Sequence, residues 1–150
     1  MNTSSEDQLR QIRETFGYDR VYSFHEGLAQ VRKGKEEFHI RPDGQPAYRE
    51  RYDFAGPFSE GLAVVRKGEE YFHIRPDGQP AYRERYDDVS LFSEGLAWVR
   101  KGEEFFHIRP DGQPAYRERY DDVGSFSEGL AWVQKGKEFF HIRPDGTRAD

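Results

Sequence analysis

Cysteine is absent from the sequence, which excludes disulfides, thiolate metal sites and cysteine nucleophiles. Only histidines and carboxylates remain to hold a metal ion. No run of apolar residues is long enough to span a bilayer, and none follows Met1 as a secretory signal would. We therefore expect a soluble, cytoplasmic protein with no membrane partner.

Apolar residues are also scarce, and neither sign of charge strongly outnumbers the other. Charged residues make up 34% of the 150 residues and the mean hydropathy is -1.01, so the chain has little material for a deep core. The net charge is only -5, with acids and bases interspersed, which argues against a nucleic-acid partner held by bulk charge. The aromatic content of 15% instead indicates large flat side chains packed in shallow sheets.

A 34-residue repeat organises the chain, because a Tyr-Asp pair recurs at this interval without insertion or deletion. The pairs begin at Tyr18, Tyr52, Tyr86 and Tyr120. We predict a repeat domain over residues 18–150, preceded by an N-terminal segment of residues 1–17. Its units are 18–51, 52–85, 86–119 and a partial 120–150, which lacks the Pro-Ala-Tyr-Arg-Glu-Arg segment of the others.

Tetratricopeptide helix pairs share this period, but the prolines and glycines of the unit exclude them. Pro76 and Pro80 lie four residues apart and would break any helix long enough to pair. Between such breakers apolar and polar residues alternate, as in Phe72, His73 and Ile74, which is typical of a strand. The sequence therefore predicts an all-β tandem repeat.

A two-residue hairpin loop at Gly68-Glu69 sets the register of two strands. It pairs Lys67 with Glu70, Val65 with Phe72, and Ala63 with Ile74. The opposite strand face carries two positions that change together from polar to aromatic along the array. These pairs are Gln30 and Glu37, Val64 and Tyr71, Trp98 and Phe105, and Trp132 and Phe139. We interpret the first pair as facing water, which gives the array a direction.

A short amphipathic helix is expected before the first repeat. Ser5 and Gln8 have capping-box spacing, and Leu9, Ile12 and Phe16 share one helical face. Such a helix would cap the array, whose end unit otherwise exposes the surface that its neighbours bury. The predicted fold is an open, solenoid-like array of stacked β-hairpin or three-strand units, and a small closed propeller-like ring is the alternative.

The repeat resembles the bacterial WG-repeat family over residues 18–146. The resemblance rests on Phe-Ser-Glu-Gly-Leu-Ala, followed by an aromatic strand and an Asp-Gly turn; the motif stands at 58–63, 92–97 and 126–131. Phe-His replaces the Trp-Gly pair that names the family, which indicates a divergent subfamily. The resemblance implies a β-repeat scaffold attached to varied partners, and it supplies no catalytic residues.

An aromatic and cationic stripe in the third and fourth units is the candidate binding face. It consists of Trp98, Phe105, His107, Arg109, Trp132, Phe139, His141 and Arg143. Aromatic and arginine side chains concentrate binding energy at interfaces, and sugars stack on flat rings. The alternative, favoured by the stacking of thin repeats, is burial of the stripe between units.

One histidine and one pair of arginines also recur in the repeat. A metal site needs several ligands, whereas each unit offers one histidine, so we expect no metal and no other cofactor. The imidazoles are expected to pack on the tryptophans and to bond a neighbouring strand or carboxylate. Arginine pairs such as Arg83 and Arg85 have the spacing to hold phosphate, but nearby acids such as Glu60 favour rows of solvated ion pairs.

Catalytic constellations normally break repeat symmetry, and only His25 departs from the repeated histidines, with no unique partner beside it. We therefore predict a non-catalytic scaffold that mediates protein or peptide interaction, with contacts toward the C-terminal half. Carbohydrate or small-ligand binding on the aromatic stripe is the alternative. Phosphate or nucleic-acid binding through the arginines ranks below it, and an enzyme ranks last.

Overall fold

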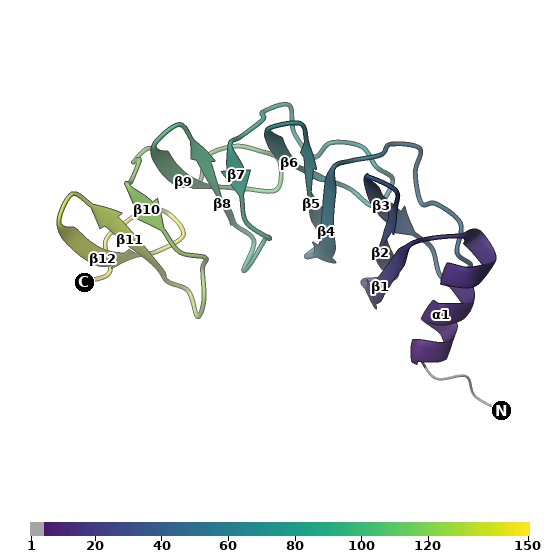
Figure 1. Cartoon of the computed structure of the whole chain (residues 1–150). Coiled ribbons are helices and arrows are strands. Elements are labelled where there is room, and N and C mark those ends of the chain that lie inside the picture. Colours follow the sequence, from purple (N-terminus) through teal and green to yellow (C-terminus); the bar gives the residue numbers. More distant parts are fainter. Residues whose placement is uncertain (1–4) are drawn as a thin grey trace.

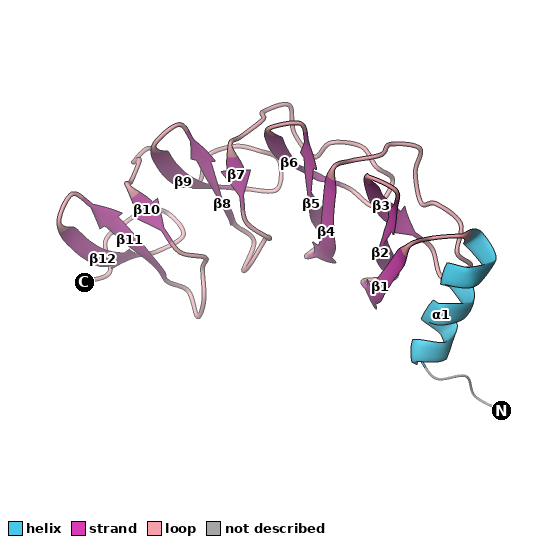
Figure 2. Ribbon diagram, in the orientation of Figure 1, coloured by secondary structure: helices cyan, strands magenta, loops and turns pink. Residues whose placement is uncertain are grey.

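The computed structural model describes residues 5–150 as one helix followed by four three-stranded antiparallel sheets; residues 1–4 of the predicted N-terminal segment lie outside this range. The elements are α1 (Ser5–Phe16), β1 (Arg20–His25), β2 (Leu28–Lys33), β3 (Glu36–Ile40), β4 (Phe54–Ser59), β5 (Leu62–Lys67), β6 (Glu70–Ile74), β7 (Asp88–Val89), β8 (Ala97–Lys101), β9 (Glu104–Ile108), β10 (Asp122–Val123), β11 (Ala131–Lys135) and β12 (Glu138–Ile142). The sheets follow one another in an open arc between α1 and β12 (Figures 1 and 2). The predicted open array with an N-terminal helix is confirmed, and the described residues form no closed ring.

The predicted hairpin register is confirmed in the second sheet, where Lys67 faces Glu70 and Val65 faces Phe72. The other sheets have the same register between their second and third strands. Gly68 enters the loop with a φ of 63°, a left-handed conformation that glycine adopts without a Cβ clash. In the first strand, β4, a bulge between Ala55 and Phe58 bends the chain away from regular pairing with β5.

The tyrosine that opens each of the last three repeats joins two consecutive sheets. Tyr120 and Phe105 exchange both backbone hydrogen bonds, each 2.9 Å long, across the outer edge of β9. The next residue, Asp121, then donates its N–H to the Gln134 carbonyl in the following sheet. Tyr52 and Tyr86 make the same bridges at the two earlier junctions. The opening tyrosine of the second, third and fourth repeats therefore bridges the edge of the repeat before it, just ahead of the first strand.

A thin core runs the length of the array. Its centre includes one valine and one isoleucine per sheet, all fully buried: Val31, Val65, Val99, Val133, Ile40, Ile74, Ile108 and Ile142. These residues alternate with the aromatic positions along their strands, so each strand buries one face in this core. The few apolar residues of the sequence are thus buried in one narrow layer that all four sheets share.

Helix α1 takes the place of a preceding repeat at the N-terminal end. Its Phe16 ring stacks on Tyr18 with centroids 5.8 Å apart, and a Cβ on Gly44 would overlap that ring. In the interior, Gly78 is packed in the same way against Tyr48 of the repeat before it. The helix therefore acts as the predicted cap, and within residues 5–150 no helix is long and apolar enough to cross a membrane.

Candidate functional site

We use the name aromatic face for the strand face that carries the four paired positions, from Gln30 and Glu37 to Trp132 and Phe139. The two members of a pair lie on adjacent strands, two residues out of direct register, and so share one face of the sheet. The rings of Trp98 and Phe105, for example, have centroids 5.6 Å apart. What covers each pair differs from one repeat junction to the next.

At the first junction the polar pair fastens the second repeat. Gln30 Nε2 donates to the Ala55 carbonyl at 2.8 Å, and the Ala55 N–H donates to Glu37 Oε1 at 3.0 Å. Both side chains are half-buried. The prediction that this pair simply faces water is therefore wrong, because its polar atoms hold the backbone of β4.

At the second junction the aromatic face opens into an apolar groove of about 510 Å³. Val64 lies in it where the later repeats have tryptophan, and Tyr71 lines it beside Val64. Phe54 and Leu91, at 39% and 42% exposure, are large apolar side chains open to solvent there. We call the site formed by Phe54, Val64, Tyr71, Val89 and Leu91 the apolar groove.

Phe54 and Leu91 were missed by the sequence reasoning, although a signal for them exists. Equivalent positions 34 residues later hold polar residues, Asp88 after Phe54 and Ser125 after Leu91. If the four copies are aligned, Phe54 and Leu91 stand out as single apolar residues at positions where other copies have polar ones. That comparison would have found both. Such departures from the repeat are informative because the repeated fold does not require them.

At the third junction and the C-terminal end the same side chains differ in exposure. Trp98 and Phe105 are half-buried beside the fourth repeat, whereas Trp132 and Phe139 are 41% and 67% exposed. The structure thus brings Trp98 together with Phe105. Only the pair of the fourth repeat is widely open to a partner.

The histidines of the first three repeats belong to the core and not to an open face. His39, His73 and His107 have no exposed surface. The Nε2 atom of His107 lies 2.8 Å from the Gly124 carbonyl, and its Nδ1 lies 2.5 Å from the Tyr116 hydroxyl. Because a carbonyl only accepts, Nε2 carries the proton and Nδ1 accepts from the tyrosine. His107, predicted as part of the candidate face, is therefore inaccessible.

Burial also sets the protonation state of these histidines. It lowers the pKa of His39, His73 and His107 to about 4, because the charged imidazolium loses its hydration. The same burial raises the pKa of the partner tyrosine hydroxyl, as at Tyr116. Each His-Tyr pair is thus a neutral hydrogen-bonded unit at pH 7. A bond to a neighbouring strand or a carboxylate was predicted, and His107 bonds the Gly124 carbonyl, directly after β10. The ring that His107 packs on is Phe126, at 4.6 Å, and not a tryptophan.

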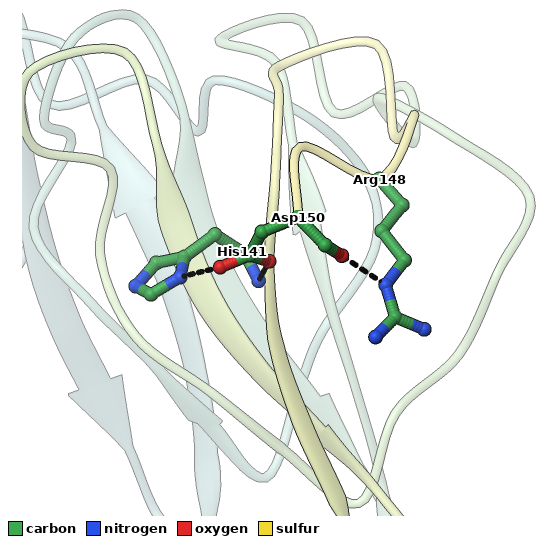
Figure 3. Close-up of polar contacts among 3 residues, drawn as sticks. All are labelled: His141, Arg148 and Asp150. Atoms are coloured by element: carbon green, nitrogen blue, oxygen red, sulfur yellow. Dashed lines mark hydrogen bonds and ion pairs between the residues drawn. The ribbon is translucent and has the colours of Figure 1, made fainter.

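His141, the histidine of the last repeat, has different partners. Its Nδ1 lies 2.9 Å from Asp150 Oδ2, and its backbone N–H donates to Asp150 Oδ1 at 2.7 Å. Figure 3 shows this pair with Arg148, which donates to the Asp150 backbone carbonyl. The backbone N–H bond from His141 lowers the pKa of the Asp150 carboxyl. The predicted bond of a histidine to a carboxylate is thus found in this repeat alone.

The two predicted arginines lie outside the aromatic cluster. Arg109 is exposed at the turn after β9, where its backbone accepts from Gly112 and donates to Gln113. Arg143 is also exposed and donates to Thr147 Oγ1 and to the Arg148 carbonyl. Within residues 5–150 neither guanidinium lies over a tryptophan ring, so the predicted cationic part of the stripe is separate from its aromatic part.

The paired arginines do not form the expected rows of ion pairs. Arg85 lies over the Phe72 ring at 3.8 Å and donates to three carbonyls, those of Tyr82, Arg83 and Glu84. Arg51 and Arg119 repeat this arrangement in their own units. One arginine of each pair is thus a structural cap on an aromatic ring. In the described part of the chain, no histidine and carboxylate cluster could hold a metal ion.

A ladder of carboxylates between successive turns was also missed by the sequence reasoning. Glu94 sits at a turn with a φ of 53°, and its two carboxylate oxygens accept from the N–H groups of Glu128 and Gly129 at 2.6 and 2.8 Å. Glu26 and Glu60 do the same to the next turn along. The invariant Glu-Gly spacing within the chain was its only sequence signal.

Comparison with known proteins agrees with this repeat geometry. A family model described as WG containing repeat matches residues 15–36, 50–71, 83–105 and 118–139. No curated protein matches the chain.

Solved structures of Hsv2 are similar in fold. KlHsv2 with loop 6CD replaced by a Gly-Ser linker has a TM-score of 0.58 and 10% identity, covering 87% of this chain and 51% of that one. Kluyveromyces lactis Hsv2p has a TM-score of 0.51 and 14% identity, covering 85% and 49%. The chain thus spans about half the length of these proteins, and at such identity the likeness concerns the fold alone. Because the family model matches more than half of its residues, the chain belongs to the WG containing repeat family.

Proposed function

We propose that the chain is a non-catalytic repeat scaffold that binds a protein or peptide partner along its aromatic face. The observation that carries this proposal is the apolar groove between the second and third repeats. Its volume of about 510 Å³ accommodates a large apolar side chain of a partner. Phe54 and Leu91 remain well exposed in it, and exposed apolar surface of this kind marks interaction sites.

The groove combines an apolar floor with a few polar groups. Val64 and Val89 are buried, and Arg66 and Asp88 are charged residues among those that line the groove. An apolar anchor with polar groups nearby is typical of a peptide-binding hot spot. The opposite charges of Arg66 and Asp88 would orient the polar backbone or side chains of the ligand.

Trp132 and Phe139 offer a second anchor on the same aromatic face. Their exposure of 41% and 67% leaves both rings open at the C-terminal end. A partner long enough to reach both places would gain affinity through the raised effective concentration of its second contact. This agrees with the prediction that partner contacts lie toward the C-terminal half.

Catalysis has little support in this arrangement. The groups with strongly shifted pKa values are the buried histidines and tyrosines, which bond each other within one repeat and do not line the apolar groove. The apolar groove itself is lined by no histidine, serine or lysine. A nucleophile with an adjacent base, which covalent catalysis needs, is thus missing from the described groove.

The test is a peptide selection on the intact chain, followed by affinity measurements on Phe54→Asp/Leu91→Ser. These substitutions install the residue types found at Asp122 and Ser125, so the fold is retained. We expect the variant to bind the selected peptides at least about tenfold more weakly, because anchor residues carry most of the binding energy. Glu69→Ser, in an exposed hairpin loop, is the matched control.

Selected peptides that bind the groove variant as tightly as the unchanged chain would refute this function. The carbohydrate alternative rests on the exposed ring of Trp132, because sugars stack on flat indole faces. Titration of tryptophan fluorescence with a sugar panel separates the two. A fluorescence response to sugars that Trp132→Val removes would favour the alternative.

A further inference from the structure

We infer that the apolar groove takes the indole ring of a tryptophan residue of a protein or peptide partner, above the backbone of Gly56 and beside Tyr71. This inference rests on the proposed function and deepens it, because it names the side chain that the groove recognises. All the residues that line the groove belong to the second and third repeats. Its shape is therefore set by the interior of the array.

The fourth repeat supplies the first template for this contact. There Trp132 stands at the position of Val64, and Gly124 at the position of Gly56. A Cβ placed on Gly124 would lie only 2.1 Å from Trp132 Nε1 and 2.5 Å from Trp132 Cδ1. One edge of the indole ring therefore fills the space directly above the glycine backbone, which a residue with a side chain would block.

The third repeat supplies a second template. Trp98 stands there at the position of Val64, and Ser90 replaces the glycine. The Trp98 ring lies 5.6 Å from the ring of Phe105, which stands at the position of Tyr71. The chain thus packs an indole on two kinds of surface within this face, a glycine backbone and the aromatic ring of the next strand.

The second repeat keeps both surfaces and lacks the indole. Gly56 and Tyr71 both line the apolar groove, together with Val64. A Cβ on Gly56 would meet nothing closer than Phe54 Cε2 at 3.5 Å and the Val64 carbonyl at 3.6 Å, which is ordinary van der Waals contact. The space that an indole fills above Gly124 is therefore open above Gly56, with Phe54 as a wall beside it.

The walls of the groove suit an indole better than an aliphatic side chain. Phe54 and Tyr71 offer rings for aromatic pairing, which adds to the gain from apolar burial. Asp88, which also lines the groove, accepts from the Val89 N–H with Oδ1 at 2.9 Å, and its other oxygen makes no hydrogen bond within residues 5–150. That oxygen is an acceptor for the indole N–H, a group that phenylalanine and leucine lack.

The two tryptophans of the sequence are already packed on their own repeats. Trp132 lies over Gly124, and Trp98 lies beside Phe105. Neither lines the groove between the second and third repeats. A second folded copy would bring the same two rings in the same packed positions, so the tryptophan belongs to a different polypeptide.

The experiment is an NMR titration of the intact, nitrogen-15-labelled chain with three blocked peptides, Ala-Ala-Trp-Ala-Ala and its counterparts with a central phenylalanine or leucine. We expect the tryptophan peptide to shift the amide signals of Gly56 and Val64 saturably, while that of Val31 in the first repeat stays unchanged. The phenylalanine peptide should bind about fivefold more weakly, because it has no N–H to donate. The leucine peptide should bind at least about tenfold more weakly, since it also lacks the ring.

Two variants close the space above Gly56 from inside the chain. Gly56→Ala keeps the fold, because its Cβ meets no atom closer than 3.5 Å and the third repeat carries Ser90 at this position. It should weaken the tryptophan peptide at least about tenfold, because the Cβ overlaps the ring edge. Val64→Trp installs the ring of the later repeats and should abolish binding. Glu69→Ser is the control, and if Val64→Trp fails to fold, Gly56→Ala decides alone.

The inference is overturned if the tryptophan peptide causes no saturable shift at Gly56, if the leucine peptide binds as tightly, or if Gly56→Ala leaves the affinity unchanged. Free indole that binds as tightly as the tryptophan peptide would also overturn it, by removing the polypeptide from the recognition. A failure here, while Phe54→Asp/Leu91→Ser still weakens the selected peptides, would refute this inference and leave the proposed function standing.

Discussion

The third junction and the C-terminal edge contain the same side chains in different surroundings. His107 has no exposed surface and bonds Tyr116 and Gly124, whereas the His141 side chain is 48% exposed and bonds Asp150. Phe105 is half-buried beside the next repeat, and Phe139 is 67% exposed. The first strand of the following repeat therefore creates the buried environment, and the residue types alone do not.

This difference shows how stability is distributed along the array. In repeat proteins each unit gains stability from its nearest neighbours, and here that gain is concentrated in the strand that opens the next unit. The same substitution can be made at an interior copy and at the terminal copy of one position. The difference between the two losses of stability is the part that comes from the junction with the next repeat. Four predictions use this design.

Acidification should produce the largest effect. The folded-state pKa of His39, His73 and His107 is about 4, below the ordinary value near 6.5, so the unfolded chain binds more protons between these values. The free energy of unfolding therefore falls as the pH drops from about 6.5 to 4, by about 3 kcal/mol per histidine. Urea unfolding at pH 7 and 4.5, followed by circular dichroism, measures the loss.

The exposed histidines serve as the control for this acid sensitivity. A chain carrying His25→Asn and His141→Asn should retain the whole loss, because the three buried imidazoles are untouched. Equal unfolding midpoints at the two pH values, or a loss that disappears in this control, would assign the effect to other groups.

Removal of single histidines should produce the next largest difference. His107→Ala leaves the Tyr116 hydroxyl and the Gly124 carbonyl without their bonds and opens a cavity, which costs about 3 kcal/mol. His141→Ala should cost less than about 1 kcal/mol, because its site is solvated. Urea denaturation of both variants at pH 7 measures the two costs, and similar values would contradict the account.

Replacement of the tryptophans by the valine of the second repeat should have an intermediate effect. Trp98→Val removes a half-buried ring that contacts Phe105, and we expect a loss of about 2 kcal/mol. Trp132→Val should cost about 0.5 kcal/mol, because that ring is 41% exposed. Thermal unfolding of the two variants ranks them, and a larger loss at Trp132 would mean that the C-terminal edge is already covered.

The carboxylate ladder should give the smallest difference. Glu94→Ala removes the acceptor of two backbone N–H groups and should cost about 1 kcal/mol, since the site is exposed. Glu128→Ala removes a carboxylate that accepts from no turn within residues 5–150, and in this chain it should be neutral. Both positions have the same positive φ, so any change in backbone strain is the same in the two variants. The difference between their unfolding midpoints therefore reports the lost hydrogen bonds.

Much of the fold follows from local patterns in the sequence. The hairpin of Lys67 and Glu70 was predicted from one glycine and strand alternation, and the N-terminal helix from a capping box and its apolar face. Contacts between repeats were harder to predict. Every unit carries the same histidine, so a single sequence does not show which group of the next repeat each histidine meets across a junction.

The candidate site shows the same limit. The paired gradient from Gln30 to Trp132 was visible in the sequence, but its meaning was not, because Gln30 bonds the backbone of Ala55 rather than water. His107 was grouped with the tryptophans from strand alternation, which identifies a shared face and leaves open what covers it. The exposure of a strand face in an array depends on how the next repeat packs against it. The alternation of apolar and polar residues within one strand does not contain that information.

Amide hydrogen exchange of the intact chain tests the central claim most directly. The claim is that each interior edge is bridged by the opening tyrosine of the next repeat and that, within residues 5–150, nothing bridges the edge at Phe139. The amides of Glu37, Tyr71 and Phe105, each bonded to a tyrosine carbonyl, should exchange slowly, and the amide of Phe139 should exchange fast. Protection of Phe139 equal to that of Phe105, in the chain without any added partner, would contradict the account.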